Sequence, residues 1–143
     1  MEILLDVNVL VALLWPQHAM HEPAWEWFAA LAARKQQWAT CAFTEAGAVR
    51  VLSNPGVSQG TLTPARVTEL LRENLRRPGH KRWVMDMDWP EALQVSGIGI
   101  ESHQQVTDVY LIGLAVKNKG LLATFDRVLG ARSESVVVLG RKV

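Results

Sequence analysis

Four acidic residues lie in or beside stretches of sequence that are otherwise apolar: Asp6, Glu45, Asp108 and Asp126. Burying a carboxylate costs free energy unless the group is paired or binds a metal ion. If the four carboxylates converge, their repulsion raises their pKa values, and a divalent cation relieves it. Oxygen ligands suit Mg²⁺ or Mn²⁺, and the His and Cys ligands typical of zinc are absent from this set. A cation held there can lower the pKa of bound water and generate hydroxide near neutral pH.

Each of these acids also has a simpler interpretation. Asp6 and Asp126 could cap the helices that follow them. Glu45 could be a first-turn acid that the helix dipole favours. Asp108, on the apolar side of a helix, could pair with a basic residue, either Arg50 or Lys117. The sequence alone leaves these alternatives open.

Several basic and aromatic residues fall outside this set. Five basic residues gather around one helix end and the segment after it: Arg72, Arg76, Arg77, Lys81 and Arg82. They either bind phosphate groups or form an ordinary solvated helix end. We interpret Trp25, Trp27 and Trp38 as core or dimer contacts. Trp15 and Trp89 are the better candidates for stacking on bases.

The acids are separated by short apolar runs and by segments with helical periodicity. These patterns predict strands at residues 3–7, 37–40, 82–87, 121–124 and 136–139. They predict helices at 9–15, from His18 or His21 to about 32, at 44–52, from Pro64 to about 77, and at 104–118. Residues 88–102, with Pro90, Gly97 and Gly99, are predicted to be mostly loop.

Strands that alternate with helices over the whole length indicate an α/β fold with a central, mostly parallel sheet covered by helices on both faces. We expect residues 1–143 to form a single domain. In such sheets the functional crevice lies beyond the carboxyl ends of the strands. Asp6 and Asp126 both fall there, each after a short apolar run.

Composition sets limits on the class of protein. The chain has 143 residues, 49% of them hydrophobic, and a net charge of +1. Its one cysteine, Cys41, excludes an internal disulfide and suits a packing role. No run approaches the roughly 18 apolar residues of a membrane span. We therefore expect a cytoplasmic protein with no membrane association.

The acidic motifs resemble those of the PIN-domain ribonucleases, and among these the VapC toxins of bacterial toxin–antitoxin (VapBC) pairs. The motifs are Leu5-Asp6-Val7-Asn8-Val9-Leu10, Thr44-Glu45, Thr107-Asp108 and Thr124-Phe125-Asp126. The resemblance spans nearly the whole chain, and it implies a PIN-like three-layer α/β/α sandwich. It also implies a Mg²⁺-dependent endoribonuclease that leaves a 5′-phosphate and a 3′-hydroxyl, with transfer RNA or ribosomal RNA loops as substrates.

The resemblance also implies roles for individual residues. Asp6, Glu45, Asp108 and Asp126 match the catalytic acids; Asp6, Asp108 and Asp126 would hold the metal, and Glu45 would orient or deprotonate the water. Asn8 and Thr124 match polar positions near the metal, and Arg50 and Arg127 lie near enough in sequence to contact substrate. Arg127 departs from many relatives, which carry another acid shortly after the last one, and this weakens the case for a second metal.

The expected partners are an RNA substrate, a cognate VapB-type antitoxin and a second copy of the chain in a homodimer. A different class of function stays open: a catalytically degenerate PIN-like module that binds RNA or acts as a scaffold. The presence of all four acids favours the enzyme.

Overall fold

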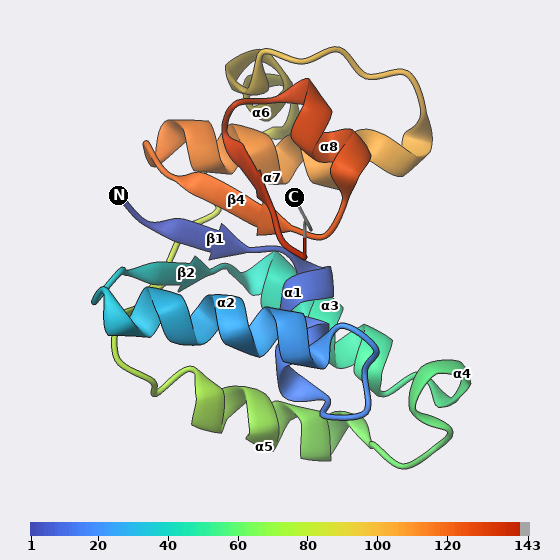
Figure 1. Cartoon of the computed structure of the whole chain (residues 1–143). Coiled ribbons are helices and arrows are strands. Elements are labelled where there is room, and N and C mark those ends of the chain that lie inside the picture. Colours follow the sequence, from blue (N-terminus) through green and yellow to red (C-terminus); the bar gives the residue numbers. More distant parts are fainter. Residues whose placement is uncertain (141–143) are drawn as a thin grey trace.

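A computed structural model describes residues 1–140 and confirms the predicted α/β fold. The elements follow one another in this order: β1 (Ile3–Leu5), α1 (Val7–Leu14), α2 (His21–Ala33), β2 (Trp38–Thr40), α3 (Ala42–Leu52), α4 (Pro55–Ser58), α5 (Pro64–Asn74), β3 (His80–Arg82), α6 (Trp89–Ser96), the 3₁₀ helix η1 (His103–Gln105), α7 (Val106–Lys117), β4 (Leu121–Thr124), α8 (Arg127–Arg132) and β5 (Val136–Val138). The strands pair in parallel in the order β3-β2-β1-β4-β5. Figure 1 shows the sheet between two helical layers, with α1, α2, α3 and α5 on one face and α6, α7 and α8 on the other.

Each face of the sheet has its own apolar core. Leu5 and Trp38 pack in the core with α1, α2 and α5, whereas Leu4 and Ala39 pack in the core with α6 and α7. This division follows from the alternation of side chains along a strand. Because β1 is covered on both faces, all three of its residues are apolar and buried. Packing on both faces therefore holds β1 in place, and with it the position of Asp6, which directly follows the strand.

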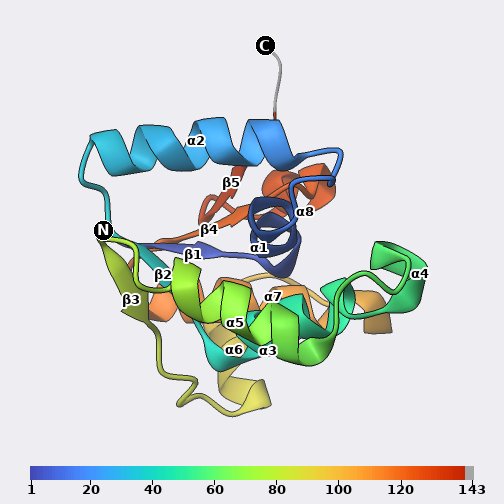
Figure 2. The same ribbon diagram turned by 90° about the horizontal axis from the view of Figure 1, so that it is seen from below.

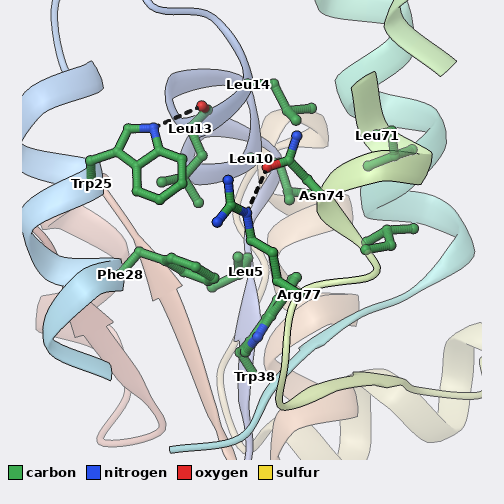
Figure 3. A pocket seen from close by; sticks show the side chains of 11 residues that line it. Leu5, Leu10, Leu13, Leu14, Trp25, Phe28, Trp38, Leu71, Asn74 and Arg77 are labelled. Carbon is green, nitrogen blue, oxygen red and sulfur yellow. Dashed lines mark hydrogen bonds between the residues drawn. The ribbon is translucent and has the colours of Figure 1, made fainter. Parts of the chain in front are cut away.

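Helix α1 lies between α2 on one side and α3 and α5 on the other (Figure 2). An apolar cavity of about 20 Å³ remains among α1, α2 and α5. Figure 3 shows Arg77 over the ring of Trp25, 4.6 Å from the ring centroid, with its Nε donating to Asn74 Oδ1 over 2.9 Å. Arg77 therefore forms part of the cavity wall, and its guanidinium is held by contacts within the protein.

The strand predicted at residues 82–87 is wrong in position. The observed strand β3 ends at Arg82 and begins at His80, before the expected start. It is an edge strand whose neighbour, β2, has three residues, so the ladder stops where β2 stops. After Arg82 the chain leaves the sheet, burying Trp83 and leaving Val84 71% exposed.

The expectation of a loop over residues 88–102 is also wrong in part, because α6 occupies Trp89–Ser96. The Asp88 side chain accepts a hydrogen bond from the backbone N–H of Glu91, Pro90 lies in the first turn, and Gly97 ends the helix in a left-handed conformation. The short helices α4 and α8 were not predicted either. Within residues 1–140, no helix has both the length and the apolar character needed to cross a membrane.

Candidate active site at the carboxyl ends of the central strands

The chain moves from one side of the sheet to the other at β1. Strands β2 and β3 lie on one side of β1, and β4 and β5 lie on the other. In open parallel sheets, ligands bind beyond the carboxyl ends of the strands at such a point. Asp6 directly follows β1, and Asp126 lies two residues after β4. The topology therefore brings acids from the two ends of the chain to one edge of the sheet.

Asp6 is buried, with 7% of its surface exposed, and both of its carboxylate oxygens accept hydrogen bonds. Oδ1 accepts from the backbone N–H of Val7 over 2.7 Å, which caps α1, and Oδ2 accepts from the Thr124 hydroxyl over 2.8 Å. Burial raises the pKa of Asp6; the Thr124 and Val7 hydrogen bonds oppose this effect, and the charge of Asp126 adds to it. Asp6 therefore caps a helix and also belongs to an acidic cluster.

The Thr124 hydroxyl connects several predicted site residues. It donates to Asp6, and it accepts from Asn8 Nδ2 over 3.1 Å and from the backbone N–H of Asp126 over 3.2 Å. One donated and two accepted hydrogen bonds use the full capacity of a hydroxyl group. Asn8 Oδ1 in turn accepts from the backbone N–H of Phe125 over 3.2 Å. The network ties the end of β4 to the start of α1.

Asp126 caps α8 through one oxygen. Its Oδ1 accepts from the backbone N–H groups of Val128 and Leu129, over 2.9 and 3.1 Å. Within residues 1–140, no protein hydrogen bond engages its Oδ2. The capping interpretation of Asp126 is thus compatible with a role in binding an ion.

Asp108 lies in the first turn of α7, half-buried, and makes no ion pair with the described part of the chain. Lys117, one of its suggested partners, instead contacts Asp86 over 3.0 Å. Burial, followed by the charges of Asp6 and Asp126, raises the pKa of Asp108 to about 6. Three aspartates thus lie close enough to repel one another.

The chemistry of these three aspartates suits a hard divalent cation, which would relieve their repulsion. Across residues 1–140, no three His, Cys, Asp or Glu side chains are gathered closely enough to hold an ion as they stand. Asp108 is unpaired in this part of the chain and Asp126 uses only Oδ1 for its cap, so both keep carboxylate oxygens that an ion can bind. The donor set therefore fits a metal by its chemistry rather than as a preformed cage.

Glu45 contacts a different set of residues from the three aspartates. Its Oε2 accepts from the Thr40 hydroxyl over 2.7 Å, and its Oε1 lies 3.4 Å from a guanidinium nitrogen of Arg82. The Thr40 hydroxyl also lies 2.7 Å from Nε2 of His80. Burial lowers the pKa of His80, the charge of Glu45 opposes that shift, and Arg82 adds to it. Glu45 thus faces the β2–β3 side of the sheet edge.

Thr40 and His80 were not singled out from the sequence. Thr40 is the last residue of β2, directly before Cys41 and α3, and His80 opens β3. The signal that points to Thr40 is a fully buried hydroxyl at the end of a central strand, which needs a hydrogen-bond partner. His80 carried no comparable signal, because its strand was predicted to begin later.

The two arginines predicted to contact substrate are both exposed. Arg50 lies in the last turn of α3, and Arg127 is the first residue of α8. Arg127 lines a groove with β5 residues Val136, Val137 and Val138. Arg127 thus directly follows Asp126 in the chain, whereas Arg50 lies more than one helical turn after Glu45 on α3.

Comparison with known proteins agrees with this fold. The PIN domain family matches residues 3–133. Ribonuclease VapC39 of Mycobacterium tuberculosis is 38% identical over 138 residues, which cover 96% of this chain and 98% of that protein.

Two solved structures share the fold at 15% sequence identity. VapC20 of Mycobacterium tuberculosis, described as a sarcin–ricin loop cleaving toxin, has a TM-score of 0.61 and covers 90% of this chain and 93% of its own. VapBC2 of Rickettsia felis, bound to a DNA fragment from its promoter, has a TM-score of 0.60 and covers 96% and 97%. The family match, the near full-length sequence identity and the shared sheet lead to one conclusion: the chain belongs to the PIN-domain family and, within it, to the VapC ribonucleases, the toxins of VapBC toxin–antitoxin systems.

Proposed function

We propose that this protein is a Mg²⁺-dependent endoribonuclease whose reaction centre is the cluster of Asp6, Asp108 and Asp126. The observation that supports this most directly is the raised pKa of Asp108, to about 6, caused by burial and by the other two aspartates. Three mutually repelling carboxylates at the point where the chain changes sides of the sheet suit binding of a cation.

Asp6, Asp108 and Asp126 would hold Mg²⁺, with Mn²⁺ as the alternative ion. When bound, the metal supplies a water of lowered pKa and stabilises charge on a phosphate oxygen. Arg127 follows Asp126 where a further acid would be needed for a second all-protein site. We therefore propose that the protein itself binds one metal ion.

The remaining site residues orient these groups. Thr124 donates to Asp6 and so fixes the direction of its carboxylate, while Asn8 holds the backbone after β4. Glu45, which accepts a hydrogen bond from Thr40, would orient the attacking water or accept its proton from the β2 side. Arg50 and Arg127 would contact RNA phosphates next to the cleaved bond.

The test is cleavage by Asp6→Asn, with Asp86→Asn as the matched control. Asp86 is an exposed acid that pairs with Lys117 outside the aspartate cluster. We expect Asp6→Asn to lose at least ~100-fold of metal-dependent cleavage, with an unchanged circular dichroism spectrum, and Asp86→Asn to cleave like the wild type. Wild-type cleavage by Asp6→Asn, or cleavage that survives EDTA, contradicts the proposed metal site. RNA binding without cleavage by the wild type in Mg²⁺ favours the alternative, a module that binds RNA and does not cut it.

In the cell, we propose that the chain acts as a cytoplasmic toxin that cuts transfer RNA or ribosomal RNA loops and leaves a 5′-phosphate. A VapB-type antitoxin would silence it, and it would act as a homodimer of single-domain chains, residues 1–143. The family membership and the likeness to a VapBC structure support an antitoxin partner. Mapping of RNA ends after induced expression identifies the substrate, and rescue of growth by the gene adjacent to this one identifies the antitoxin.

A further inference from the structure

A second feature lies on the same edge of the sheet, on the β3 side. It is a groove of about 490 Å³ between α5 and β3. Its walls carry three arginines, Arg72 from α5, Arg76 from the turn after α5 and Arg82 from β3, together with Glu45 and His80. Among the residues that the structure describes, Glu45 is the one acid in this wall, so three arginines face a single carboxylate.

Arg72 lies in the last turn of α5 and Arg76 in the turn that follows the helix, and both line the groove. Like charges that line one groove repel each other. Neither side chain makes an ion pair or a hydrogen bond with the described residues, in contrast to Arg66 on the same helix, which pairs with Glu69 over 3.1 Å. Two adjacent uncompensated guanidinium groups that face one groove suit an anionic ligand.

The other basic residues of this region have different environments. Arg77 is held against Trp25 and Asn74, as Figure 3 shows. Lys81 lines a separate groove near Glu2 and Asp86. Of the five basic residues that cluster in sequence, only three therefore face the groove.

Glu45 is anchored at one wall of this groove. Since the Thr40 hydroxyl donates to Glu45, Nε2 of His80 must carry the proton that it donates to Thr40. The contact from Arg82 to Glu45 is longer, 3.4 Å, and the Arg82 side chain is 64% exposed. Since the contact is long and the Arg82 end of it is exposed to solvent, the guanidinium of Arg82 remains available to an incoming anion.

We propose that Arg72, Arg76 and Arg82 bind the phosphate backbone of the same RNA strand that is cut at the aspartate cluster. This inference rests on the proposed nuclease function and adds a substrate site to it. Strands β1 and β3 flank β2, so the ends from which Asp6 and Arg82 project are separated by two strand spacings, about 10 Å. A continuous strand of RNA can span that separation along one edge of the sheet. The arginines would then contact its phosphates rather than its bases.

The experiment measures RNA binding without cleavage, in the Asp6→Asn protein with EDTA. A 5′-labelled single-stranded RNA of mixed sequence, about 12 nucleotides long, serves as the probe in fluorescence anisotropy. We expect the added pair Arg72→Ala and Arg76→Ala to weaken binding at least ~10-fold. The slope of log K against log salt should fall by about 0.7 for each arginine. The matched control, Arg66→Ala, removes a paired arginine from the same helix and should leave affinity and slope unchanged.

In the otherwise wild-type protein, the same pair of substitutions should raise KM for cleavage and leave kcat nearly unchanged. The groove proposal is wrong if the double variant binds RNA with wild-type affinity and salt slope, or if Arg66→Ala weakens binding as much. Unchanged RNA binding with lost binding of a labelled acidic peptide would assign the groove to a protein partner instead. Cleavage that persists in Asp6→Asn would refute the nuclease site, whereas the binding measurement would still judge the groove.

Discussion

The orientation of several site residues depends on one functional group, the Thr124 hydroxyl. It donates to Asp6 and accepts from Asn8 and from the backbone of Asp126, and Thr124 itself is fully buried. Under the proposed function, Thr124 would orient the metal ligand Asp6 without contacting the metal itself. Its importance should therefore appear as a change in metal affinity rather than as a loss of fold.

We expect Thr124→Val to raise the Mg²⁺ concentration needed for half-maximal cleavage by about 10- to 100-fold. Thr124→Ser keeps the hydroxyl and should restore most of the affinity. Thr61→Val is the matched control, because that hydroxyl bonds only to Ser58 O in the loop before α5. A Mg²⁺ titration of the cleavage rate checks this, and an unchanged midpoint in Thr124→Val would show that Asp6 needs no support from Thr124.

For individual residues, the sequence indicated which acids influence one another better than it indicated where their side chains point. The apolar stretches around Asp6, Asp108 and Asp126 indicated convergence, and the three influence one another's charge in the structure. The direction of Glu45 depends on Thr40 and Arg82, two residues that are neighbours through the pairing of β2 with β3. Because β3 was predicted in the wrong place, that environment was not foreseeable.

The elements that were predicted correctly are those with strong local signals. Strands β1, β4 and β5 are short apolar or β-branched runs, and α5 begins with a Thr cap and a proline. Helix α6 escaped prediction although it starts with Asp88 and Glu91, a capping pair, because Pro90 and Gly97 were interpreted as loop signals. Pro90 lies in the first turn and Gly97 just past the last one, where each suits a helix.

Helices α6 and α7 lie close together at Gly113. A Cβ atom placed on Gly113 would lie 2.6 Å from the carbonyl oxygen of Ala92, which is too close for any side chain. We expect Gly113→Ala to push α6 away from α7 and to lower the free energy of unfolding by about 1–3 kcal/mol. Gly99→Ala is the control, because open space surrounds a Cβ there. Urea denaturation measures both, and equal stabilities would show that α6 can shift at no cost.

For the molecule as a whole, the acidic cluster makes stability depend on pH. Asp108 has a pKa of about 6 in the folded protein against 3.8 for the free side chain. Between these values the folded state binds a proton that the unfolded state has released, so stability falls as pH rises from about 4 to about 6. The raised pKa of Asp6 acts in the same direction.

We therefore expect metal-free Asp108→Asn to be more stable than the wild type above pH 6 and similar to it near pH 4. Because Asp108 is half-exposed, solvent reduces the effect to about 1 kcal/mol, or a shift in Tm of about 3 °C. Thermal melts at both pH values, with EDTA, check this. A wild-type Tm that rises between pH 4 and pH 6 while the Asp108→Asn value stays flat would give Asp108 the opposite sign.

The central position of β1 in the sheet also determines when the site can form during synthesis of the chain. Its residue Ile3 pairs with Leu121, and Asp126 follows Asp6 by 120 positions. At roughly 5–20 residues per second, a ribosome needs about 6–24 s to reach the last acid after making the first. Until then the nascent polypeptide lacks both β4, which pairs with one side of its central strand, and part of the proposed reaction centre. Under the proposed function, the chain therefore cannot cut the RNA of the translation machinery that is producing it before Asp126 has been made.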